Sequence, residues 1–166
     1  MNRSLLLLVS ILVSGLFAFN SCEKKVISLD PELPDLIPEK LFEAFIDGVQ
    51  FIDTILWGAE STANSTLTIT ATADGAYPKI ILILPSDIVP GNYTFGGTQS
   101  TSRAILKFGP LPADQFEADS GKLWITRHNT DVDFTRGSFE FLAKASAGNT
   151  STLEFDVTDG QFIVSY

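Results

Sequence analysis

Residues 41–51 read LFEAFIDGVQF, and this stretch decides the fold. Apolar side chains at Phe42, Ala44 and Ile46 alternate with residues that point the other way, and Asp47-Gly48 then interrupts the run. Alternation with a period of two is typical of a β-strand, and Asp-Gly between two such strands is typical of a tight hairpin turn. The stretch therefore predicts a β-hairpin whose second strand runs from residue 50 to residue 57.

The same pattern continues to the end of the chain. Residues 66–71 alternate threonine with apolar residues, and the unbroken apolar run at 80–84 predicts a central strand covered on both faces. Residues 109–121 predict a long connection, and Asp159-Gly160 predicts another turn. Together these signals predict an all-β domain over residues 41–166, an antiparallel β-sandwich or barrel of about ten short strands.

The N-terminal segment predicts export and a lipid anchor. Arg3 precedes an apolar run from Leu5 to Phe19, which is short for a membrane span and is typical of a signal peptide. Ser21 and Cys22, the only cysteine in the chain, then form a lipobox-like cleavage site. We expect residues 1–21 to be removed and Cys22 to carry acyl chains, which would hold the protein on a membrane without a transmembrane helix. The outer membrane of a Gram-negative bacterium is the predicted location.

Residues 22–40 predict a linker between this anchor and the domain. Three prolines recur among acidic residues there, and proline cannot donate a hydrogen bond to a sheet interior. Arg3 is the only charged residue in 1–21, so the mature chain has 10 basic and 20 acidic residues, a net charge of −10. Nucleic-acid binding requires a basic face, so we expect no nucleic-acid partner.

Four segments in order resemble an uncharacterised, domain-of-unknown-function family of small all-β lipoproteins from Bacteroidota. They contain the first hairpin, a Pro-Gly turn with its strand, a later strand pair and the last Asp-Gly, and they lie at residues 42–51, 90–96, 121–126 with 137–141, and 159–162. The resemblance implies a β fold and a place in the cell envelope. It implies no activity and no catalytic residues.

The sequence predicts no catalytic or metal centre. His128 is the only histidine, and we expect it to be a partly exposed residue at a strand end. Asn129, Asp131 and Asp133, with the later Glu140, have the spacing of calcium ligands in an EF-hand, but Phe134 stands where that loop needs glycine. We expect no metal and no cofactor, and we treat those residues as the sole alternative metal ligands.

Trp57, Tyr93 and Trp124 are the candidate ligand-binding residues. Trp124 lies between Leu123 and Ile125 and should point to the opposite sheet face, where an aromatic ring can stack on a sugar and neighbours such as Arg127, Asn129 or Asp131 can bond its hydroxyls. The alternative, which we favour from sequence, is that Trp124 fills a second core layer of a sandwich.

We therefore expect a lipid-anchored envelope protein with a non-catalytic binding or structural role, and a glycan or an envelope protein as its partner. Two other functions remain open at this stage. One is a hydrolase that uses paired carboxylates, since the 20 acidic residues provide many candidate pairs. The other is an adhesion-type module stabilised by calcium.

Overall fold

The computed structural model describes residues 40–53, 57–61, 64–73, 76–98, 100–147 and 149–166, with side chains given outside 57–61. The predicted signal peptide, Cys22 and all but the last residue of the predicted linker lie outside these ranges. Within these ranges the elements are ten β-strands and one short 3-10 helix, η1, at Pro112–Asp114: β1 Leu41–Ile46, β2 Val49–Ile52, β3 Trp57–Ser61, β4 Thr66–Thr72, β5 Lys79–Pro85, β6 Gly91–Phe95, β7 Arg103–Lys107, β8 Gln115–Asn129, β9 Phe134–Ala145 and β10 Glu154–Ser165. Within the described residues no helix is long and apolar enough to cross a bilayer.

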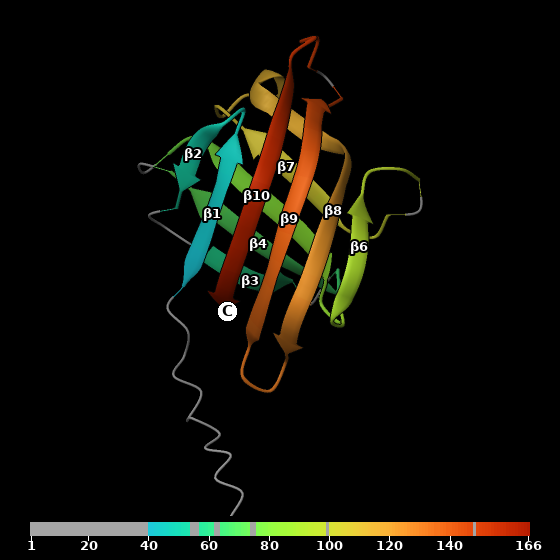
Figure 1. Ribbon diagram of the computed structural model, residues 1–166. Coiled ribbons are helices and arrows are strands. Elements are labelled where there is room, and N and C mark those ends of the chain that lie inside the picture. The colour runs from blue at the N-terminus through green and yellow to red at the C-terminus, as the bar shows by residue number, and fades with distance from the viewer. Residues whose placement is uncertain (1–39, 54–56, 62–63, 74–75, 99, 148) are drawn as a thin grey trace, which may run out of the picture. The chain divides into compact units, whose positions relative to one another are not determined.

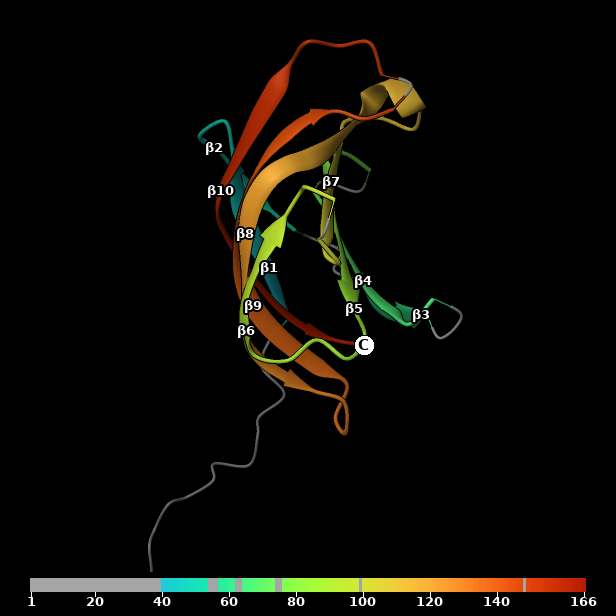
Figure 2. The same cartoon turned by 90° about the vertical axis from the view of Figure 1, so that its right-hand side faces the viewer.

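All ten strands belong to one antiparallel sheet. Its order is β2-β1-β10-β9-β8-β7-β5-β4-β3, and β6 pairs with the second half of β8. The sheet curls over so that β1, β10, β9, β8 and β6 form a front layer and β7, β5, β4 and β3 cross behind it (Figures 1 and 2). The long strand β8 belongs to both layers, because its first residues pair with β7 and its later ones with β6. The predicted all-β antiparallel fold is confirmed.

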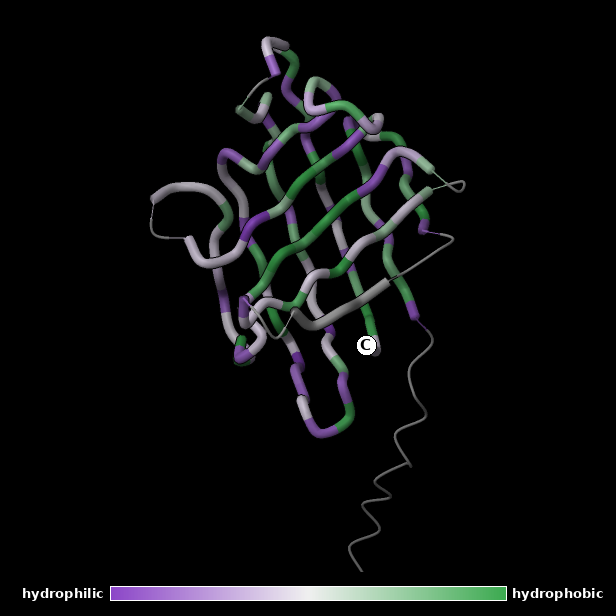
Figure 3. Tube along the Cα trace, turned by 180° about the vertical axis from the view of Figure 1, so that it is seen from behind, coloured by the Kyte–Doolittle hydropathy of each residue, from purple (hydrophilic) through white to green (hydrophobic). Residues whose placement is uncertain are grey.

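The core fills the space between the two layers. Phenylalanine dominates the front-layer side of it: the Phe139 ring centroid lies 5.2 Å from that of Phe42 and 6.3 Å from that of Phe162, and all three rings are buried. Aliphatic side chains of β4 and β5 supply the other side, and the apolar run of β5 is visible in Figure 3. Strand β5 is interior to the sheet, as predicted. Its outward residues Ile81 and Ile83 are only half-buried, so the expected cover on both faces is wrong.

The three longest strands differ from the short strands that we predicted. Residues 109–121 are not one long connection, because β8 begins at Gln115 and continues through Gly121. Asp159-Gly160 is not a turn, because β10 continues through it and the pairing with β9 shifts register between Val157 and Gly160. Asp159 has a φ of +52°, which marks a β-bulge in a continuous strand.

Three glycines in these long strands face buried phenylalanine rings on the neighbouring strand. Gly137 pairs with Phe162, Gly160 with Phe139 and Gly121 with Phe141. A Cβ on Gly160 would lie 2.5 Å from the Phe139 ring, so a side chain cannot fit without displacing the ring. The missing side chains therefore give the rings room beneath the strands, at the places where the sheet bends.

The predicted hairpin turn at Asp47-Gly48 is confirmed, but its second strand is shorter than predicted: β2 ends at Ile52, and Trp57 begins the separate strand β3. Asp47 and Gly48 have φ angles of +48° and +77°, as a type I′ turn requires, and they join β1 to β2. The turn is also tied to β10, since the Asp156 backbone N–H donates to Asp47 Oδ1 at 2.8 Å and the Asp47 N–H donates to the Asp156 carbonyl at 2.8 Å.

Replacing Gly48 with alanine should lower the free energy of unfolding by about 1 kcal/mol, because L-residues are disfavoured at positive φ. No atom lies within 4 Å of the position that the new methyl group would take, so steric clash adds nothing. Urea unfolding of Gly48→Ala measures the loss. Gly91→Ala is the control, since Gly91 lacks a positive φ and its nearest neighbour is 3.8 Å away. Equal stability of Gly48→Ala and the unaltered protein would contradict the assignment of a type I′ turn with positive φ at Gly48.

Candidate functional site

The outer face of the front layer has a row of polar side chains in register around one tryptophan. Trp124 of β8 pairs with Asn92 of β6 on one side and with Ser138 of β9 on the other. Ser138 pairs with Gln161 of β10, and Gln161 pairs with Glu43 of β1. Paired residues point to the same sheet face, so the five side chains form one row across five strands.

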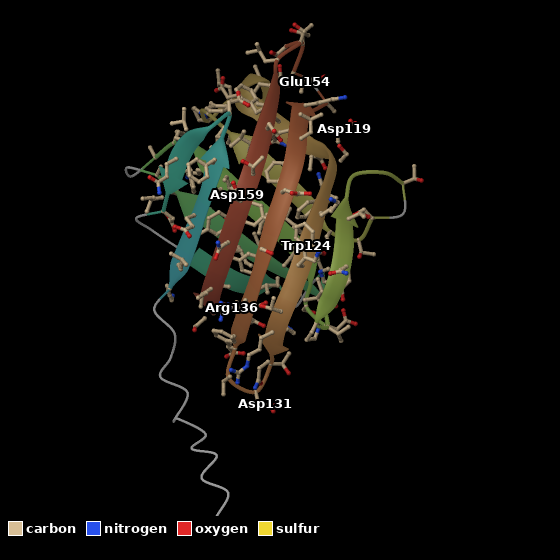
Figure 4. All side chains as sticks on the ribbon, in the orientation of Figure 1. Asp119, Trp124, Asp131, Arg136, Glu154 and Asp159 are labelled. Atoms are coloured by element: carbon tan, nitrogen blue, oxygen red, sulfur yellow. The ribbon has the colours of Figure 1, made fainter. Side chains whose placement is uncertain are left out.

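Trp124 is half-buried and lies outside the core. The Lys122 Nζ lies 5.7 Å from the centroid of the indole ring and 3.0 Å from Glu140 Oε1. Figure 4 shows Trp124 on the near face of the front layer. The predicted orientation, opposite to Leu123 and Ile125, is therefore correct, and the second core layer that we favoured from sequence is wrong. The single sheet curls instead of stacking a further layer on this face.

A shallow groove of about 450 Å³ lies beside the indole ring. Small residues make the hollow: Ser138, Gly137 and Gly160 lie between longer neighbours. Strands β8, β9 and β10 all contribute, and the full lining is Trp124, Thr126, Arg136, Gly137, Ser138, Phe139, Glu140, Asp159, Gly160 and Gln161.

The groove has opposite charges at its two ends. Arg136 and Glu140 lie two residues on either side of Ser138 along β9, which places them about 13 Å apart at the rise of a β-strand. The bulge of β10 presents Asp159 near the Glu140 end, since Gly160 pairs with Phe139. Arginine therefore marks one end and two carboxylates mark the other, with the indole ring between them.

A domain family described as a domain of unknown function, DUF6252, matches residues 39–164. The chain belongs to the DUF6252 family. The match includes all of the first nine strands and nearly all of β10. An uncharacterised family was what the sequence led us to expect. Comparison with curated proteins found no match, and neither did comparison with solved structures.

The other aromatic candidates of this DUF6252 domain do not join the groove. The Tyr93 ring packs against the core, and its hydroxyl donates to the Val89 carbonyl at 2.7 Å. Trp57 begins β3, at the opposite end of the sheet order from the front layer, and its side chain lies outside the described residues. Trp124 is therefore the one aromatic candidate whose side chain the described structure places in the groove.

Its predicted hydrogen-bonding neighbours are also different. The guanidinium of Arg127 lies over the Phe134 ring, 5.5 Å from the centroid, and Asn129 and Asp131 belong to the β8–β9 hairpin end. In their place the DUF6252 groove has Arg136, Gln161 and Asp159, from two other strands. A β-bulge between Ile125 and Arg127 changes which sheet face the residues after it point to. No local pattern in the sequence indicates that bulge.

The EF-hand-like residues of the DUF6252 chain do not converge. Asn129 Oδ1 accepts the Asp131 backbone N–H at 2.8 Å, the Asp133 carbonyl accepts from the Tyr166 N–H at 2.9 Å, and Glu140 lies in the groove. In the part of the chain that the structure describes, no three metal-binding side chains gather.

His128 is half-buried near the end of β8, as predicted. Its Nε2 lies 3.1 Å from the Ser86 carbonyl oxygen, and its ring stacks on Tyr166 with centroids 6.4 Å apart. An imidazole that donates to a carbonyl cannot at the same time accept a proton from a serine through that nitrogen. These contacts fit a structural role for His128.

Proposed function

We propose that this chain is a lipid-anchored protein of the bacterial cell envelope whose β domain binds glycans, without catalysis, in the groove beside Trp124. The observation that carries the proposal is a half-buried indole on the outer face of a regular sheet, next to small and polar residues in register. Sites for small ligands combine an apolar surface with a few well-placed polar groups, and this groove has both.

The chemistry of the groove fits a sugar ring. An indole face can cover the C–H groups of a pyranose, while Ser138, Gln161 and Thr126 offer hydroxyl and amide groups to its hydroxyls. The side chains stand on three neighbouring strands, which hold them in place before a ligand arrives. A binding function therefore needs no rearrangement of the described backbone.

The surroundings of the carboxylates favour binding over hydrolysis. Glycosidases need one carboxylic acid to donate a proton and a second carboxylate to act opposite it, and an apolar pocket usually keeps the first one protonated. Glu140 Oε1 instead lies 3.0 Å from Lys122 Nζ, and Asp159 is exposed on the bulge. Both carboxylates can accept hydrogen bonds from sugar hydroxyls.

Trp124→Ala should weaken glycan binding by tenfold or more, because it removes the stacking surface. Calorimetric titration of the full chain in detergent micelles, against a panel of neutral and acidic oligosaccharides and cell-wall fragments, measures the affinity. Leu111→Ala is the control, since Leu111 is exposed beside the 3-10 segment away from the groove. Unchanged affinity in Trp124→Ala would refute this site, and no glycan binding at all would favour an envelope protein as the partner.

The proposed anchor rests on the sequence of residues 1–22. Cys22→Ser should abolish labelling by a radioactive fatty acid and move the protein from the membrane fraction to the soluble fraction, because acyl chains provide the attachment. Ser21→Ala is the matched control, since alanine is as small as serine at the cleavage site. Membrane retention of Cys22→Ser after alkaline washing would contradict the lipid anchor.

A further inference from the structure

We propose that the ligand is an acidic glycan, and that Arg136 binds the carboxylate of the sugar whose ring stacks on Trp124. This inference rests on the proposed function, because it names the class of sugar for the same groove. It follows from the partners of the basic side chains at the site, from their positions along the strands and from the charges at the far end.

Lys122 and Arg136, which share the sheet face of Trp124, differ in their partners. Lys122 Nζ is already 3.0 Å from Glu140 Oε1 and lies over the indole ring. The Arg136 guanidinium lines the groove, and no carboxylate among the described residues forms an ion pair with it. Arg103, by comparison, binds Glu117 at 2.7 Å on another part of the surface. Arg136 is therefore the cation in the groove that is available to a ligand.

The position of Arg136 suits a sugar carboxylate. It lies two residues before Ser138 on the same face of β9, and Ser138 pairs with Trp124. Two residues span about 7 Å along a strand, which a pyranose with its exocyclic carboxylate can bridge. A guanidinium presents paired donors that match both oxygens of a carboxylate, so it recognises this group better than a hydroxyl. Figure 4 shows Arg136 and Trp124 on the same face of the front layer.

The charges at the opposite end of the groove determine the orientation in which the ligand binds. Glu140 and Asp159 line that end, and their negative charges repel a carboxylate and accept hydrogen bonds from hydroxyls. An acidic sugar therefore binds with its carboxylate at Arg136 and its neutral hydroxyls toward Asp159. The net charge of the chain, −9, adds a general repulsion of anions, so the pairing with Arg136 has to be local and specific.

The test compares each acidic oligosaccharide with its own methyl ester, which keeps the ring and removes the charge. The probes are oligomers of galacturonate, glucuronate and mannuronate, titrated into the full chain in detergent micelles. We expect at least one acid form to bind tenfold or more tightly than its ester. In Arg136→Gln this preference should fall to less than threefold, while affinity for the ester stays the same. Arg103→Gln, which removes the same charge elsewhere, should keep the preference.

The outcomes separate this inference from the proposed function. If acids and esters bind with equal affinity, and Trp124→Ala binds neither of them, the acidic-glycan inference is overturned and glycan binding beside Trp124 stays in place. A preference that survives in Arg136→Gln would also overturn it. Failure of every acid, ester and neutral glycan to bind would overturn both. Thermal unfolding of Arg136→Gln and of Arg103→Gln shows that each variant is folded, and we expect both melting temperatures near that of the unaltered protein, since both side chains are exposed.

Discussion

Replacing Phe139 with alanine should lower the free energy of unfolding by about 3–5 kcal/mol, as expected for a buried phenylalanine. Phe139 is 1% exposed, and its ring contacts those of Phe42, Phe141 and Phe162. Its removal leaves a cavity at the centre of the front-layer core, and rings held on three different strands cannot close it. A loss of this size is a large part of the stability of a typical domain.

Chemical denaturation of Phe139→Ala and of Phe45→Ala measures this effect with one residue type. Phe45 is 37% exposed on the outer face of β1 and serves as the control. We expect a clearly smaller loss for Phe45→Ala. Similar losses in both variants would show that the phenylalanine cluster does not form the centre of the core.

The second large effect is expected from Gly137→Ala, which should cost about 1–3 kcal/mol by overpacking. A Cβ on Gly137 would collide with the backbone carbonyl of Trp124 and lie 2.7 Å from Cζ of the Phe162 ring. A carbonyl within a paired strand cannot turn away cheaply, so the strands have to separate. Because Gly137 also lines the groove, the substitution should also shift the position of the Trp124 side chain.

Gly91→Ala is the matched control for Gly137→Ala, since its added methyl meets only the Tyr93 ring at 3.8 Å. The free energies of unfolding obtained from denaturation curves of the two variants should differ by about 1–3 kcal/mol, with Gly137→Ala the less stable. If both variants are equally stable, the account of glycine and phenylalanine pairs in the bent strands is wrong.

Short sequence patterns predicted correctly the features of the fold that depend on neighbouring residues in the chain. The hairpin at Asp47-Gly48 follows from two residues that accept positive φ between alternating strands. The same dipeptide at Asp159-Gly160 misled us, because it forms a bulge in β10 whose glycine faces the Phe139 ring on β9. That requirement comes from a neighbouring strand, and no window of sequence around residue 159 contains it.

The candidate site was predictable only in its central residue. Alternation along β8 correctly placed Trp124 opposite to Leu123. Arg136 and Gln161 come from β9 and β10, and their approach depends on strand order and on bulges in both strand pairs. One residue of slippage in either pairing would turn these side chains to the other face, so the groove could not be assembled from pattern alone.

Tryptophan fluorescence tests the central claim, glycan binding beside Trp124, most directly, because the chain has just two tryptophans. The measurement titrates acidic and neutral oligosaccharides into Trp57→Phe, which reports on Trp124 alone, and into Trp124→Phe, which reports on Trp57 alone. We expect a saturable shift of emission to shorter wavelength in Trp57→Phe and none in Trp124→Phe, since a stacked sugar excludes water from the indole ring. A shift that persists in Trp124→Phe and is lost in Trp57→Phe, or no shift in either variant, would contradict the account.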